Sequence, residues 1–237
     1  MNFYYVTTDE GKRKKFAVGG LKEVYRYERT ICPTCKGQCV TPDYYQLFNY
    51  KTWNLKMYMS RDHYADFMST EYLQLIISEK AKKVLTENFG DAVDFGDIEM
   101  VSHRDLSAEK LKEIRDAQGY AYAKKIPNDP PQFYRLFLKR DAAIDFEKSG
   151  YKLVVDCPTC GYKFYEQPIF EYSVELGKIT YTPTVYIIES TWKGCDIFRA
   201  EGEGLAIFCT DKFKEAYDQH KLTGLIFSSD YLKVETV

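Results

Sequence analysis

The sequence has no long apolar run, and this absence limits where the protein can work. No stretch of the 237 residues is apolar over the roughly 18 positions that a membrane-spanning helix needs. The first residues, MNFYYV, also lack the basic start and the apolar segment of a secretory signal. We therefore expect a cytoplasmic protein without membrane contact, whose thiols stay reduced.

Charge of one sign is not in excess either. Lys and Arg number 33 and Asp and Glu number 35, which gives a net charge of −2. Proteins that bind nucleic acid usually carry a basic face or stripe, so this balance predicts no nucleic-acid partner. After position 163 the chain has 7 basic and 12 acidic residues, a charge of −5. A mildly acidic surface of this kind suits a basic protein partner.

Catalytic signatures are also missing. Residues 94–96 (Asp-Phe-Gly) and 103–105 (His-Arg-Asp) resemble kinase loops, but their order is reversed and no Gly-rich phosphate loop accompanies them. No Gly-x-Ser-x-Gly motif is present. Three carboxylates do not fit a calcium-binding loop and are expected in a solvated loop: Asp91, Asp94 and Asp97. The histidines form no ligand-spaced pair: His63, His103 and His220. We expect a protein that is not an enzyme.

One motif, by contrast, occurs twice. Cys-Pro-Thr-Cys spans residues 32–35 and again residues 157–160. A C-x-x-C pair in a tight turn directs two thiolates toward one point, and two such turns supply the four ligands of a closed tetrahedral zinc site. The motifs lie far apart in the sequence, so two distant segments must meet in space. The prediction is one structural Zn²⁺ bound by four thiolates: Cys32, Cys35, Cys157 and Cys160.

Three other interpretations of the motif stay open. A thioredoxin-like redox pair needs a helix directly after the motif, and neither motif precedes a clear amphipathic helix. Disulfide bonds are typical of secreted proteins, and the chain has an odd number of cysteines, seven. A degenerate site that no longer holds metal is the third interpretation. An extra thiol, Cys39, follows the first motif at a spacing that matches no iron–sulfur pattern.

Two of the remaining cysteines are predicted to lie in the core, and the aromatic content indicates either a β-rich fold or a protein-binding surface. Cys195 and Cys209 lie in apolar contexts, and we expect both to be small buried hydrophobic side chains. Aromatic residues make up 16% of the chain and include 21 Tyr. This bias is typical both of β-rich proteins and of protein-binding surfaces.

Apolar periodicity and turn residues predict several strands and about three helices. The helices are expected at residues 69–88, with Ser69 or Thr70 as the cap, 107–118 and 210–221. Strands are expected at 2–7, 21–31, 97–102, 133–137, 151–155, 165–174, 184–189, 205–209 and 225–227. Without βαβ alternation, this pattern predicts an α+β fold with mixed or antiparallel sheets. The turns at 32–35 and 157–160, which we call the two knuckles, are expected to come together as in a zinc ribbon. We expect one domain over residues 1–237, with 66–150 as a candidate insertion, and no internal repeat beyond the knuckles.

Three segments in the C-terminal third carry a resemblance to a known family, together with the two knuckles. They are Gly194-Cys195-Asp196-Ile197-Phe198-Arg199, Ile207-Phe208-Cys209-Thr210-Asp211-Lys212-Phe213 and Leu222-Thr223-Gly224-Leu225-Ile226-Phe227. With these segments, the chain from the first knuckle to residue 227 resembles the double-CXXCG motif immunity protein family. The resemblance is weakest between residues 45 and 150. In the first knuckle Lys36 stands where the family has Gly. A Gly there usually relieves a positive φ, so Lys36 must adopt that conformation or the turn must differ.

The resemblance implies the antidote half of a bacterial toxin–immunity pair. Such a protein binds and blocks a cognate toxin protein in the cytoplasm of the producing cell or its kin. We read Asp196 and Arg199 as structural residues, with an ion pair between them that would fix the strand after the second knuckle, and a role at an interface is the alternative. The alternative function is a zinc-ribbon nucleic-acid-binding or transcription-associated protein, which predicts a basic, aromatic-lined face that the charge balance does not indicate.

Overall fold

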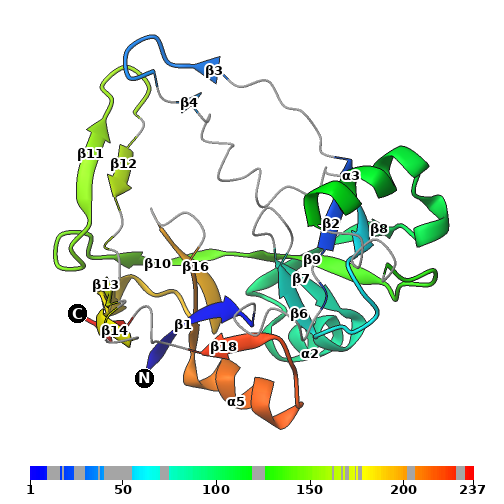
Figure 1. Ribbon diagram of the computed structural model, residues 1–237. Helices are drawn as coiled ribbons and strands as arrows, with labels where there is room; N and C mark the ends of the chain where they lie inside the picture. Colours follow the sequence, from blue (N-terminus) through cyan, green and yellow to red (C-terminus); the bar gives the residue numbers. More distant parts are fainter. Residues whose placement is uncertain are drawn as a thin grey trace.

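Figure 1 shows the computed structural model of the protein. It describes residues 1–9, 17, 19–23, 30–36, 38–39, 55–69, 75–118, 126–161, 163–166, 168, 171–173, 175, 178–201, 206–227 and 233–237. Within these ranges there are three α helices: α2 (Glu79–Phe89), α3 (Ala108–Gln118) and α5 (Asp211–Gln219). Two short 3-10 helices accompany them, η1 (His103–Asp105) and η2 (Glu189–Thr191). None of the helices in the described ranges is both long and apolar enough to cross a membrane.

Two large sheets hold most of the strands (Figure 1). The seven-stranded sheet has the order β18 (Leu225–Phe227), β1 (Phe3–Thr8), β17 (Ile207–Thr210), β16 (Ile197–Glu201), β10 (Arg140–Ile144), β15 (Thr184–Ile188), β19 (Lys233–Thr236). The six-stranded sheet has the order β2 (Gly19–Glu23), β5 (Leu55–Met59), β8 (Val93–Met100), β9 (Phe133–Leu138), β7 (Leu75–Ser78), β6 (Phe67–Ser69).

Three two-stranded ribbons complete the described strands. They are β3 (Thr30–Ile31) with β4 (Gln38–Cys39), β11 (Lys152–Asp156) with β12 (Lys163–Glu166), and β13 (Glu171–Ser173) with β14 (Lys178–Tyr181). Most neighbouring strands are antiparallel, whereas β5/β8, β10/β16 and β15/β19 are parallel. The mixed sheets and the three helices confirm the predicted α+β fold.

The helix predicted at residues 69–88 is wrong in its first half. Ser69 ends β6 and residues 75–78 form β7, so α2 begins only at Glu79. Its cap is Ser78, whose hydroxyl accepts the Ala81 N–H at 3.2 Å. The apolar run at 75–77 is fully buried in the sheet, and periodicity alone does not distinguish such a short run from a helix. The predicted cap at Thr70 lies outside the described residues.

The other two helices are confirmed. Helix α3 follows Ser107, whose hydroxyl accepts the Lys110 N–H. Helix α5 follows Thr210, but the Thr210 hydroxyl donates to Asp196 and makes no capping bond. The carboxylates expected in a solvated loop are placed differently, because Asp94 and Asp97 lie within β8.

Contrary to the expectation from sequence, the chain contains an internal repeat. We call the residues before β9 the first half and those from β9 onward the second half. In the first half the hairpin β6–β7 leads into α2 and then β8, and in the second the hairpin β16–β17 leads into α5 and then β18. The strand registers agree: Phe67 faces Ile77 as Ile197 faces Cys209.

The two halves also exchange a strand. Strand β1 of the first half pairs with β17 and β18 of the second, whereas β9 of the second half pairs with β7 and β8 of the first. The registers again match position for position: Phe3 faces Thr210 as Phe133 faces Ser78, and Thr8 faces Leu225 as Leu138 faces Val93. Each half therefore completes the sheet of the other, as in an isologous dimer with swapped strands.

Side-chain contacts recur with the strands. The Ser78 hydroxyl donates to Asp66 at 2.7 Å, as the Thr210 hydroxyl donates to Asp196 at 2.7 Å. The Lys80 ammonium contacts the second oxygen of Asp66 at 3.5 Å, and the Lys212 ammonium contacts that of Asp196 at 2.8 Å. Asp196 is thus a structural residue, which ties β16 to the start of α5.

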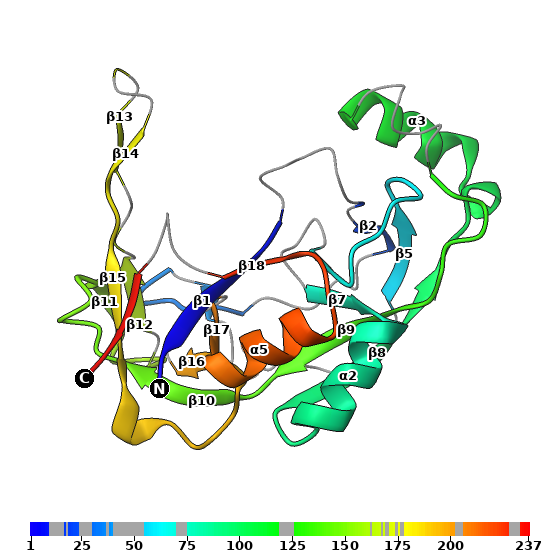
Figure 2. The same cartoon turned by 90° about the horizontal axis from the view of Figure 1, so that it is seen from below.

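Helices α2 and α5 lie side by side beneath the sheets (Figure 2). The rings of Phe89 and Phe213 pack with centroids 5.4 Å apart. The largest hydrophobic cluster takes buried residues from both helices and both large sheets. The two halves therefore bury apolar faces against each other.

Candidate metal centre

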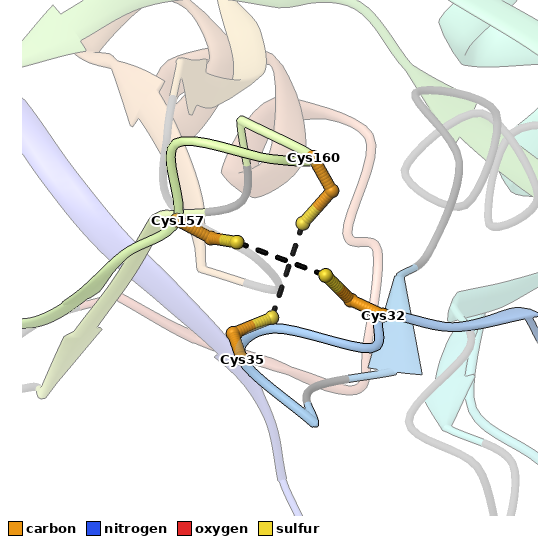
Figure 3. Close-up of side chains that lie close together, drawn as sticks. All are labelled: Cys32, Cys35, Cys157 and Cys160. Atoms are coloured by element: carbon orange, nitrogen blue, oxygen red, sulfur yellow. Dashed lines mark hydrogen bonds between the residues drawn. The ribbon is translucent and has the colours of Figure 1, made fainter.

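Each Cys-Pro-Thr-Cys motif forms the turn of a two-stranded ribbon. Ile31 pairs with Gln38 around the first motif, and Asp156 pairs with Lys163 around the second. Because the flanking strands hold both ends of each turn, the two thiols of a motif project to the same side. Figure 3 shows all four side chains pointing into one space between the ribbons.

The four sulfur atoms lie close enough together to hold one metal ion. All four Sγ atoms lie within 4.8 Å of one another. The Cys32 and Cys157 Sγ atoms are 3.7 Å apart, and those of Cys35 and Cys160 are 3.9 Å apart. Zn–S bonds of about 2.3 Å in tetrahedral geometry place the sulfurs about 3.8 Å apart. These separations are far longer than a disulfide bond of about 2.05 Å, so the thiol set fits Zn²⁺.

The two knuckles face each other as equivalent partners. The Thr34 and Thr159 hydroxyls, which occupy the same position in the two motifs, are hydrogen-bonded at 2.8 Å. Contacts between equivalent residues are what a two-fold relation produces. The four-cysteine cluster therefore lies where the two halves of the repeat meet.

The turns are alike although their sequences differ after the second cysteine. The Lys36 N–H donates to the Cys32 carbonyl at 3.0 Å, and the Gly161 N–H donates to the Cys157 carbonyl at 2.8 Å. Lys36 has φ of 54° and Gly161 has φ of 69°. Of the two outcomes expected from sequence, Lys36 adopts the left-handed conformation itself.

Backbone N–H groups around the site favour thiolates. The Cys35 N–H is the largest influence on the Cys32 thiol, and with the Thr34 N–H it lowers the pKa to about 6, although burial acts in the opposite direction. The Cys160 N–H is likewise the main cause that lowers the pKa of Cys157. Cys32 and Cys157 are buried, whereas Cys35 is half-buried and Cys160 is exposed. The site thus has a dry side and a wet side, and its two buried thiols, Cys32 and Cys157, ionise more readily than a free cysteine.

The other cysteines lie elsewhere in the molecule. Cys209 is completely buried in β17, as predicted, and burial is the main cause that raises the pKa of its thiol. Cys195 is only half-buried, which corrects the prediction for that residue. Cys39 lies in β4, but its side chain is outside the described part of the structure.

Among the described residues, these four thiols form the only group of three or more His, Cys, Asp or Glu side chains close enough to hold a metal ion. The group coincides with the set predicted from sequence. Sequence reasoning missed the Thr34–Thr159 contact and the repeat around it. The sequence signal was the identity of the inner Pro-Thr residues in both motifs.

Comparison with known proteins adds no assignment. No protein-family model matches the chain, and the curated proteins contain no match to it. The geometry of the site therefore carries the functional argument.

Proposed function

We propose that the protein is a non-catalytic immunity protein that holds one structural Zn²⁺ and binds and neutralises a cognate bacterial toxin in the cytoplasm. The proposal of a zinc ion rests on the convergence of four thiols, whose Sγ atoms all lie within 4.8 Å of one another: Cys32, Cys35, Cys157 and Cys160. Four thiolates fill the coordination sphere, so the ion would clamp the two ribbons and have no open position for catalysis. Its binding free energy would add to the folding free energy.

The proposal of a protein partner has separate support. The resemblance of the knuckles and the tail to immunity proteins suggests the toxin as the partner. Next to the zinc site, the β11–β12 ribbon also exposes three large apolar side chains: Leu153 at 48%, Val154 at 56% and Phe164 at 46%. Val154 and Phe164 are candidates for a protein-binding surface, because large exposed apolar side chains gather at such sites. A ribbon fixed by metal would present them rigidly, which lowers the entropy lost on binding.

Co-expression with the neighbouring gene tests the function. We expect that gene to encode a larger protein with a toxic C-terminal domain, and we expect this chain to restore growth and to co-purify with it. Val154→Asp and Phe164→Asp should weaken the complex by about tenfold or more, whereas Ile226→Asp, an exposed apolar position in β18, should not. A neighbour without toxicity, or a toxin that this chain neither binds nor neutralises, would reject the proposal. Specific nucleic-acid binding by the purified protein would favour the alternative.

A further inference from the structure

A cleft of about 530 Å³ is lined by charged side chains, in contrast to the apolar β11–β12 ribbon. It lies between the end of α2, the start of β10, the loop before β16 and the first turn of α5. Three lysines and three aspartates contribute to its lining: Lys139, Lys193, Lys212, Asp91, Asp141 and Asp196. The Lys212 ammonium is already paired with Asp196 at 2.8 Å. With cations and anions in equal number, the cleft suits a polar ligand without a large net charge.

The internal repeat shows what fills the equivalent place in the other half. There the segment at residues 221–224, which follows α5, lies against Asp66. The Thr223 N–H and hydroxyl donate to the Asp66 carboxylate at 3.0 and 3.1 Å, and the Thr223 carbonyl accepts the Phe67 N–H at 2.9 Å. The Lys80 ammonium donates to the Lys221 carbonyl at 2.8 Å. Asp66 and Lys80 correspond to Asp196 and Lys212 of the cleft, so this half contains a filled version of the same site.

The segment after the helix takes a different path in the two halves. Helix α5 ends at Gln219, and Lys221 and Gly224 have positive φ, whereas α2 continues to Phe89 and none of residues 89–92 has positive φ. Gly224 has φ of 100°, and a β-carbon there would collide with the Phe67 carbonyl. The matching position after α2 is Ala92, because Ala92 O accepts the Lys139 N–H as Gly224 O accepts the Asp9 N–H. Ala92 carries a β-carbon, so it does not fit the close approach to the backbone that Gly224 makes in the filled site.

The residue before Ala92 adds an electrostatic reason. Asp91 stands where the filled site has Thr223, and a carboxylate cannot donate a hydrogen bond to Asp196. Within the described ranges the Asp91 side chain forms no hydrogen bond or ion pair. Asp196 keeps its bonds to Thr210 and Lys212, at 2.7 and 2.8 Å, and in the described part of the chain no residue takes the place of Thr223.

We propose that this cleft binds a turn of a partner protein in which a residue with a hydroxyl side chain is followed by glycine, the chemistry of residues 223–224 in the filled site. Asp196 accepts the backbone N–H and the hydroxyl of the incoming residue, and Lys212 donates to a carbonyl just before it. The glycine lets the turn lie close to the β16 backbone. This inference goes beyond the proposed immunity function and requires neither the toxin nor the zinc ion.

The direct test is a titration of the full-length protein, isotope-labelled for NMR, with a blocked synthetic peptide, His-Lys-Leu-Thr-Gly-Leu, the sequence of residues 220–225. We expect shifts of the amide signals of Gly90, Asp91, Gly194 and Cys195, with a dissociation constant on the order of 1 mM, because a short flexible peptide loses much entropy on binding. Peptides with Thr→Val or Gly→Ala should bind about tenfold more weakly or not at all, since they lose a hydrogen bond to a carboxylate or gain a clash.

Variants of the protein sharpen the test. Lys212→Ala should weaken peptide binding at least about fivefold. Lys214→Ala, two residues further along α5 and placed over the Tyr4 ring, should leave it unchanged. The double variant Asp91→Thr with Ala92→Gly should let the chain fill its own cleft and abolish binding without loss of stability.

Three results would overturn the proposal. The first is no shift of the cleft signals at about 10 mM peptide, a concentration well above the expected dissociation constant. The second is equal binding of the Thr→Val peptide, and the third is a set of shifts centred on Asp66 and Phe67, which would mean exchange with the chain's own segment. Inorganic phosphate serves as a separate arm: shifts of the cleft signals by phosphate but not by the peptide would identify an anion site instead.

Discussion

Lys36 and Gly161 occupy the same position in the two knuckles, yet only one is suited to its conformation. Both have positive φ, which costs a residue with a β-carbon about 1–2 kcal/mol. A β-carbon at Gly161 would have nothing within 4 Å. A substitution by Ala there should therefore change the free energy of unfolding only through the backbone conformation. The pair therefore isolates the effect of left-handed backbone on a metal knuckle.

We predict that Lys36→Gly stabilises the protein and that Gly161→Ala destabilises it, each by about 1 kcal/mol. The measurement is the free energy of unfolding in denaturant, with zinc content determined for each variant. Lys152→Gly, in the exposed β11 strand, provides a control in which glycine should destabilise. If Lys36→Gly also lowered stability, the assignment of strain to that turn would be wrong.

Cys157 and Cys209 are both completely or nearly completely buried, but in different surroundings. Cys157→Ser removes a metal ligand, so it should abolish zinc binding and lower stability by several kcal/mol. Cys209→Ser places a hydroxyl in the apolar core and should cost about 1–3 kcal/mol with zinc retained. Calorimetry together with zinc analysis of the two variants checks this. Zinc loss in Cys209→Ser, or full zinc binding in Cys157→Ser, would contradict the assignment.

At the scale of elements, each hairpin is tied to the helix that follows it by one aspartate. Asp66 accepts hydrogen bonds from Ser78 and Thr223 and contacts Lys80, whereas Asp196 accepts from Thr210 and Lys212. The filled site thus gives Asp66 more partners than the open cleft gives Asp196. The two residues should therefore contribute differently to the free energy of unfolding, although they occupy matching positions.

We expect Asp66→Ala to destabilise by about 2–3 kcal/mol and Asp196→Ala by about 1 kcal/mol, because each lost hydrogen bond to a charged group contributes on this scale. Urea denaturation of both variants measures the difference. Lys83→Ala, on the exposed face of α2, should change stability little. Equal losses at the two aspartates would show that the Thr223 contacts contribute nothing.

The sequence predicted elements best where turn residues mark their ends. Ser107 and Thr210 precede the two helices that were placed correctly. The error at residues 69–78 arose because Leu75, Ile76 and Ile77 belong to a central strand whose buried faces remove the two-residue alternation. Tertiary pairing with β9 and β6 decides that segment, and a single sequence does not contain this information in readable form.

For the whole molecule, the cluster of four cysteines was predictable from the sequence and the repeat was not. Identical motifs marked the knuckles, whereas the repeat is preserved mainly in strand register and in a few polar contacts. Phe3-Tyr4 matches Phe133-Tyr134, and Ser78-Glu79-Lys80 matches Thr210-Asp211-Lys212, but most positions between them differ. Hydrophobic cores tolerate such replacement when volume and pattern are kept. The two halves can therefore have similar structures although few of their residues are identical.

Three of the places where the two halves meet are the exchanged strands, the shared core of α2 and α5, and the two cysteine knuckles. The first two bury apolar surface and hold the halves together. The knuckles, by contrast, are joined by thiols and by one threonine pair at 2.8 Å. We infer that this third contact depends on the ion more than the others do, since four uncoordinated thiolates would repel one another.

X-ray absorption spectroscopy at the zinc edge, on protein purified without added metal, shows whether the four thiols hold a zinc ion. One zinc per chain, with four sulfur ligands at about 2.3 Å and no nitrogen or oxygen ligand, is the result that we predict. Absence of zinc, or a zinc coordinated by fewer than four sulfurs, would contradict the account.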